Sequence, residues 1–149
     1  MKSGVRIAFD YGTRRIGVAK CDPEGILCTP LCTIAADKYG VDIDQAADIV
    51  EDESAVHVYV GNPLLLSGNV GRSSSLARKW ARELARKVAV PVTLVDERLT
   101  SVSAHSRLTQ AGLSQKRHRS IVDQEAAVII LEEALKKERA KANTEETNK

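Results

Sequence analysis

The fold is decided by the stretch VRIAFDYGTRRIGVAK at residues 5–20. An apolar run ends there on Asp10, and Tyr11-Gly12 then predicts a turn, as expected for a strand that leads into a hairpin. Residues 15–21 predict a second strand, and residues 26–34 predict a third after a turn at 22–25. We expect an antiparallel meander of three strands, with Asp10 at the carboxyl end of the first.

Helices and strands alternate in the rest of the chain. Apolar residues at helical spacing predict helices over 42–52 and 73–88, with Trp80 on the core side of the second. Short apolar runs predict strands over 56–60 and 92–96, and both look buried on two faces. Thr100 is expected to cap a helix that ends near Ala111, and a basic loop at 115–119 is expected to precede a last helix from Ile121 into the 130s.

This order of elements predicts an α/β fold. A meander followed by alternating helices and strands favours a five-stranded mixed sheet, a three-strand meander plus parallel strands, flanked by helices. Residues 1–138 are expected to form this single domain, and residues 139–149 a polar, disordered tail.

Composition restricts the class of protein. Hydrophobic residues make up 43% of the 149 and charged residues 28%, which is typical of a globular domain. Charges interrupt every apolar segment, and the short charged N-terminus does not resemble a signal peptide, so we expect a cytoplasmic protein with no membrane contact. The net charge is only +2, but residues 72–119 hold 11 Lys/Arg against 3 Asp/Glu. This segment favours a polyanionic partner, with an ordinary solvated helix face as the alternative.

The three cysteines predict no metal centre. Cys21, Cys28 and Cys32 are expected to be reduced thiols on strands, and the spacing of Cys28 and Cys32 predicts one common face. Buried strand cysteines are favoured over zinc, because no histidine is clustered with them.

Carboxylates occur where two predicted strands end and where the last helix begins. Asp10 and Asp96-Glu97 follow strands, and Asp123 lies in the first turn of the helix. Acids that converge at the carboxyl edge of a sheet repel one another unless a cation such as Mg²⁺ or Mn²⁺ lies between them. Each has a structural alternative, a turn cap for Asp10 and a helix-dipole contact for Asp123. Successive strand residues face opposite sides, so only one of Asp96 and Glu97 is expected at such a site, and periodicity does not choose between them.

Four local motifs carry a family resemblance. They are DYGTRRIGVA at 10–19, VGNP at 60–63 with SGNVG at 67–71, DERLTS at 96–101, and RSIVD at 119–123 with the apolar helix that follows. Together they resemble the YqgF family of small bacterial proteins, described as Holliday-junction-resolvase-like and as pre-16S rRNA nucleases. The resemblance spans residues 5–135, and Asn62 departs from the hydrophobic residue usual before that proline.

The resemblance implies an RNase H-like fold and an endonuclease that depends on Mg²⁺ or Mn²⁺. It implies that Asp10, Glu97 and Asp123 are the catalytic, metal-binding acids, and it favours the 5′ end of precursor 16S rRNA as the substrate. A Holliday-junction resolvase acting on branched DNA, or a non-catalytic nucleic-acid-binding module, is the alternative. Both a monomer and a homodimer remain open. Basic residues near the acids are candidate phosphate ligands: Arg14, Arg15, Arg98, Lys116, Arg117 and Arg119.

Three further expectations concern another protein class with a similar motif, the mode of nucleic-acid recognition, and two glycines. The DYGT string also resembles the phosphate loop of actin-like ATPases and sugar kinases, but those proteins need two such domains and 149 residues cannot supply both. Aromatic residues make up only 3%, so phosphate and shape recognition should dominate over base stacking. Gly12 is expected to allow a left-handed turn after Asp10, and Gly17 to pack closely beneath a helix.

Overall fold

The computed structural model describes residues 2–62, 72–96 and 115–147. In chain order the elements are β1 (Arg6–Asp10), β2 (Arg15–Cys21), β3 (Cys28–Ala35), α1 (Val41–Asp52), β4 (His57–Asn62), α2 (Arg72–Ala85), β5 (Val92–Asp96) and α4 (Gln115–Thr147). The sheet has the strand order β3-β2-β1-β4-β5. Strands β1 to β3 are antiparallel neighbours, whereas β4 is parallel to both β1 and β5. The predicted mixed five-stranded sheet is therefore confirmed, and the helix expected over 100–111 lies outside the described residues.

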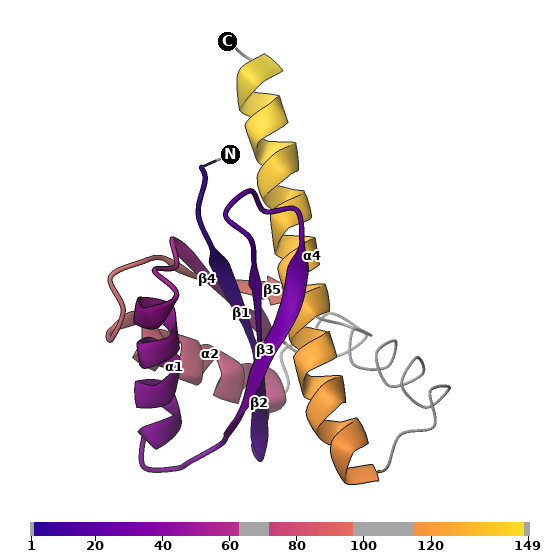
Figure 1. Cartoon of the computed structure of the whole chain (residues 1–149). Helices are drawn as coiled ribbons and strands as arrows, with labels where there is room; N and C mark the ends of the chain where they lie inside the picture. Colours follow the sequence, from indigo (N-terminus) through magenta and orange to yellow (C-terminus); the bar gives the residue numbers. More distant parts are fainter. Residues whose placement is uncertain (1, 63–71, 97–114, 148–149) are drawn as a thin grey trace.

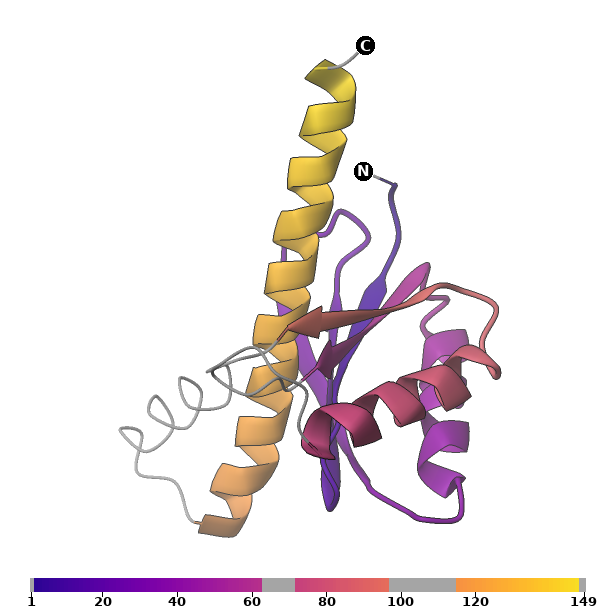
Figure 2. The ribbon, with the colours of Figure 1, turned by 180° about the vertical axis from the view of Figure 1, so that it is seen from behind.

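Helices cover the sheet on both faces. Helices α1 and α2 lie on one face and α4 on the other (Figure 1), and Figure 2 shows the same layers from behind. Side chains of β1 alternate between these faces, since Ile7 and Phe9 pack in the cluster with α1 and α2 while Ala8 packs in the cluster with α4. The same alternation assigns Asp10 to the face that α4 covers.

The two faces have different cores. On the α1 and α2 face, Trp80 is 4% exposed and its ring lies 5.4 Å from that of Phe9 in an edge-to-face contact, which confirms its predicted core position. On the other face, α4 contributes buried residues at helical spacing from Ala126 to Leu135. The strands oppose them there with small side chains such as Ala8 and Ala19, so α4 lies close to the sheet.

Gly17 marks the closest approach of α4. A Cβ atom at this position would lie 1.9 Å from the backbone oxygen of Asp123 and 2.2 Å from its carbonyl carbon. Only glycine permits such a contact, so Gly17 packs beneath a helix as predicted. The expectation for Gly12 is wrong, because its φ is not positive. Gly12 is needed for space instead, since a Cβ there would lie 2.6 Å from the Arg15 carbonyl oxygen.

A β-bulge separates the two cysteines that were expected to share a face. Cys32 pairs with Val18 while Pro30 pairs with Ala19, so β3 carries one extra residue between them. As a result Cys28 packs with the α4 cluster and Cys32 with the α1 and α2 cluster. All three cysteines are free thiols, and burial raises the pKa of each.

Helix α4 is longer than predicted at both ends. Residues 115–119, expected as a basic loop, form its first turns, and it continues to Thr147 instead of ending in the 130s. The segment contains no glycine or proline and is rich in Ala, Glu, Lys and Arg, which are strong helix formers. The predicted polar tail is thus helical from 139 to 147. In the part of the chain that the structure describes, no helix is long and apolar enough to cross a bilayer.

Strand β5 is more exposed than its apolar sequence suggests. It lies at the edge of the sheet, and Val95 is its one buried residue. An edge strand lacks a neighbour on one side, so its apolar side chains are covered only in part.

We expect Gly17→Ala to destabilise the fold by about 3 kcal/mol, because the added methyl group meets backbone atoms of α4 that cannot rotate away. Urea denaturation measures the loss. Gly40→Ala is the control, since nothing lies within 4 Å of its Cβ position and only its left-handed φ of 89° is penalised, by about 1–2 kcal/mol. An equal or smaller loss at Gly17 would contradict the close approach of α4.

Candidate active site

Asp10 is a buried carboxylate at the carboxyl end of the central strand. It is the last residue of β1, is 9% exposed, and belongs to the face covered by α4. Strands β2 and β4 flank β1 on its two sides, so this acid lies in the middle of the sheet. A carboxylate in such a place must be stabilised by hydrogen bonds or by a cation.

The contact at Gly17 brings Asp123 to the same region. Gly17 is the cross-strand partner of Asp10, and the backbone of Asp123 rests directly on Gly17. The structure therefore assembles two of the three predicted acids, one from the first strand and one from the last helix.

Arg15 is the immediate partner of Asp123. Its Nε donates to Asp123 Oδ2 at 2.8 Å, across 108 positions of the sequence. Burial raises the pKa of Asp123, and the hydrogen bond and charge of Arg15 lower it only in part. Arg15, which was predicted to bind phosphate, is thus the counter-ion of Asp123 in this structure. No local sequence signal reveals this pairing. Arg14 beside it is exposed and open to solvent.

The register of β5 shows on which face of the sheet Asp96 lies, and so bears on whether Asp96 or Glu97 is the acid near Asp10. Val95 packs in the cluster beneath α4, so the next residue, Asp96, points toward the opposite face. Asp96 is also the cross-strand partner of Asn62, whose Oδ1 accepts a hydrogen bond from Ser74 of α2 on that opposite face. Asp96 is therefore not on the face of Asp10. Glu97 and Arg98 lie outside the described residues.

Asn62 is the residue that departs from the family pattern. It is 8% exposed, and Ser74, its partner, is fully buried in the first turns of α2. The polar side chain therefore ties the end of β4 to the start of α2, a local role that its position before Pro63 did not suggest.

The donors present suit a hard divalent cation. Asp10 and Asp123 supply carboxylate oxygens, which Mg²⁺ and Mn²⁺ prefer; Asp10 is buried and Asp123 is half-buried. Within the described ranges, no group of three or more His, Cys, Asp or Glu residues could hold a metal.

The remaining basic candidates are placed only by their backbone. Lys116, Arg117 and Arg119 lie in the first turns of α4, ahead of Asp123 on the same helix. The loop predicted for residues 115–119 is therefore wrong, because these residues are helical.

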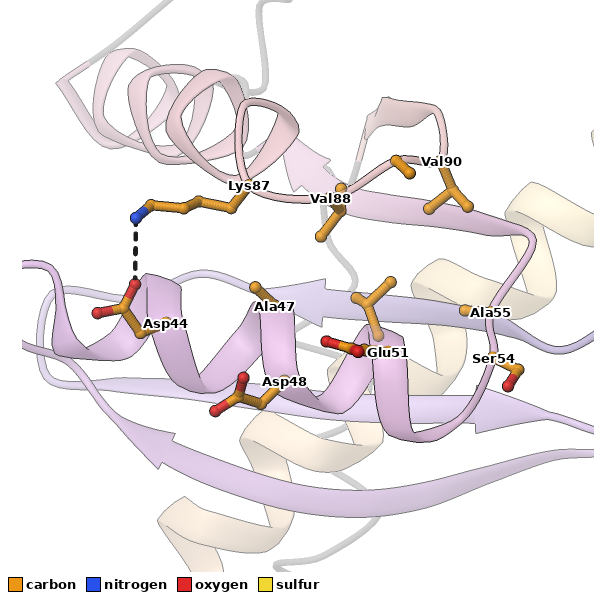
Figure 3. A pocket seen from close by; sticks show the side chains of 11 residues that line it. Asp44, Ala47, Asp48, Glu51, Ser54, Ala55, Lys87, Val88 and Val90 are labelled. Atoms are coloured by element: carbon orange, nitrogen blue, oxygen red, sulfur yellow. Dashed lines mark ion pairs between the residues drawn. The ribbon is translucent and has the colours of Figure 1, made fainter.

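A cavity of ≈ 640 Å³ lies far from these acids, between α1 and the connection from α2 to β5 (Figure 3). Its floor is apolar, with Ala47 and Val88 among the lining residues, and Asp44, Asp48 and Glu51 lie along its rim. Lys87 pairs there with Asp44 at 3.5 Å. This excess of acids repels phosphate, so the cavity does not suit a nucleic acid.

Known proteins match the chain over most of its length. The family model RuvX, described as "Holliday junction resolvase", matches residues 4–137. A protein of Frankia casuarinae is 49% identical over 140 residues, covering 93% of this chain and 69% of its own. One from Leifsonia xyli subsp. xyli is 48% identical, with 94% and 90% covered. Both are named "Putative pre-16S rRNA nuclease".

Solved structures agree on the fold. The RuvC protein of T. thermophilus, solved in complex with a Holliday junction substrate, matches with a TM-score of 0.54 at 14% identity, covering 88% of this chain and 93% of that chain. The same protein solved as "Thermus thermophilus RuvC structure" also matches with a TM-score of 0.54. With its RNase H-like fold and its match to the family model over residues 4–137, the chain belongs to the RuvX family, whose curated relatives are named as nucleases.

Proposed function

We propose that this protein is a divalent-metal-dependent endonuclease that processes the 5′ end of precursor 16S rRNA. The observation that carries the proposal is the packing of α4 on Gly17, which brings the desolvated carboxylate of Asp123 next to the strand that ends in buried Asp10. The names of the curated relatives support this substrate. Ribosomal RNA of bacteria matures in the cytoplasm, so we infer that location.

Three acids would hold the metal in this proposal. Asp10 and Asp123 are two of them, and we take Glu97 of the same acidic motif as the third, because its neighbour Asp96 faces away from Asp10. Bound Mg²⁺ or Mn²⁺ would supply a water of lowered pKa and offset the charge of the leaving oxygen. Asp123 is the ninth residue of α4 and does not lie in its first turn as predicted, so the helix-dipole alternative does not apply to it.

Arg15 and its neighbours would act on the substrate. In the structure Arg15 balances the charge of Asp123. Once a cation takes that role, its guanidinium is available to a phosphate, and exposed Arg14 lies beside it in the chain. Helical spacing places positions 116 and 119 in line with 123, so we propose that Lys116 and Arg119 contact the backbone of the substrate, with Arg117 and Arg98 as further phosphate ligands.

The second candidate is a Holliday-junction resolvase, favoured by the description of the family model. A junction needs two symmetric cuts, and hence a homodimer, whereas a single cut in RNA does not. Incubation of the purified protein with precursor rRNA, a four-way junction and linear DNA, each with Mg²⁺, Mn²⁺ or EDTA, tests both. Metal-dependent cleavage of the RNA supports our proposal, and paired cuts in the junction by a dimer support the alternative. Binding without any cleavage would indicate a non-catalytic module.

We expect Glu97→Gln to abolish cleavage with the fold retained, because it removes a charged metal ligand. Asp96→Asn is the matched control, since Asp96 lies on the opposite face and its loss should leave the rate within a few-fold of the parent protein. Cleavage rates and circular dichroism measure both variants. Loss of activity in Asp96→Asn alone would identify Asp96, and not Glu97, as the third acid.

We expect Asp123→Asn to abolish cleavage and to reduce the rise in Tm that Mn²⁺ causes in the parent protein. Burial raises the pKa of Asp123 in the folded state, so the folded protein binds its proton more tightly than the unfolded chain does. Stability of the metal-free parent protein should therefore fall as pH rises from the ordinary pKa of an aspartate to this raised value, and the variant should lack that component.

Asp44→Asn, which alters an exposed acid paired with Lys87, is the control for Asp123→Asn and should change none of these properties. A folded Asp123→Asn protein with normal cleavage and a normal response to Mn²⁺ would exclude Asp123 as a ligand.

A further inference from the structure

A groove of ≈ 580 Å³ lies on the face of the sheet that α4 covers. It is at the other end of the sheet from Asp10. Its floor is formed by His57 and Tyr59 of β4 and by Thr93 and Val95 of β5, and α4 forms its wall. Strands β4 and β5 begin here, whereas the acids lie where the strands end. The last turns of α4 extend past the sheet at this end, beside the N-terminal segment of the chain (Figures 1 and 2).

Two stacked rings form part of the floor. The rings of His57 and Tyr59 lie 4.3 Å apart and are nearly parallel, at 6°. His57 Nε2 lies 2.8 Å from Thr93 Oγ1, which fixes the orientation of the imidazole. Burial lowers the pKa of His57, which favours the neutral form of the ring. Tyr59 is 5% exposed and His57 is only half-buried, so His57 is the ring that solvent and ligands reach.

Lysines give the groove a positive charge. Lys137 and Lys141 of α4 and Lys2 of the N-terminal segment line it, and all three are exposed. The acid in the lining, Glu138, is neutralised from inside: its Oε2 lies 3.1 Å from Nε of Arg6, which is 1% exposed, and its carboxylate accepts a hydrogen bond from Tyr59. Among the described lining residues Arg6 thus offsets the one acid, and the three lysines leave the groove with a net positive charge.

The groove lies on the same face of the sheet as Asp10, and the two are separated along the direction of β4. Phe9 pairs with Val60, so Asp10 is level with Gly61, four residues along β4 from His57. At about 3.3 Å per residue this separation is about 13 Å along the strand. A nucleic-acid strand that lies between α4 and the sheet edge would therefore contact both places.

We propose that the groove binds an unpaired segment of the nucleic acid next to the cleaved bond, with one base stacked on His57 and its phosphates bound by Lys137 and Lys141. The chemistry fits, since a flat neutral ring beside lysines is how proteins hold single strands. The low aromatic content of the chain argues against a long stacking platform, but one ring suffices for one base. The inference rests on the proposed nuclease function for the identity of its ligand, and it extends that function to a preference for unpaired flanking residues.

Binding without metal tests the groove separately from cleavage. Fluorescence anisotropy with a labelled single-stranded oligouridine RNA in EDTA gives the affinity, and a blunt RNA hairpin is the paired comparison. We expect Lys137→Ala/Lys141→Ala to weaken single-strand binding about tenfold and to lower the slope of log affinity against log salt by about 1.4, at about 0.7 per phosphate lost. The control Lys136→Ala/Lys38→Ala removes the same charge from exposed positions outside the groove and should change both quantities little.

The ring is tested by two substitutions of His57. His57→Ala should weaken single-strand binding about fivefold or more, whereas His57→Phe, which keeps a flat ring, should retain it. Hairpin affinity should change little in either variant.

Each outcome decides between the two proposals. Equal losses in the groove and control variants, or unchanged single-strand affinity in both groove variants, would overturn the groove even if the protein cleaves RNA. Normal groove binding without cleavage under any metal would instead contradict the nuclease function.

Discussion

The contact between Gly17 and the backbone of Asp123 is the constraint on which the rest of the site depends. Because Gly17 of β2 has no Cβ, the last helix packs onto the sheet at the point where β1 ends in Asp10. Small residues such as Ala8 and Ala19 continue this close approach along the same face. The spacing between helix and sheet is therefore set by the absence of side chains, and the place of Asp123 follows from it.

The electrostatics of the site follow from this packing. Helix α4 withdraws Asp123 from water, which raises the pKa of its carboxyl, and Arg15 compensates for only part of that cost. A divalent cation would stabilise the same charge more fully, since it can be shared with Asp10. A half-buried acid with a raised pKa is a frequent property of functional sites.

The two faces of the sheet also differ in charge: acids line the cavity on one face, and lysines line the groove on the other. The cavity beside α1 is lined by Asp44, Asp48 and Glu51, whereas the groove beside α4 is lined by lysines whose one acidic neighbour is neutralised by buried Arg6. A polyanion is repelled from the first and attracted to the second. The face that carries Asp10 and Asp123 is thus the one on which a nucleic acid is expected to bind.

The sequence by itself determined the order of strands and helices, the mixed sheet, the family and the acid at the end of β1, because these depend on local periodicity and short motifs. It placed Gly17 beneath a helix but misjudged Gly12, the face of Cys32 and the length of α4, since bulges, steric room and continued helix depend on neighbours. Only the tertiary structure decided that Asp96 faces away from Asp10, that Arg15 pairs with Asp123, and that His57 shares a groove with lysines of α4. Each of these joins residues far apart in the chain, and packing, which no local pattern encodes, brings them together.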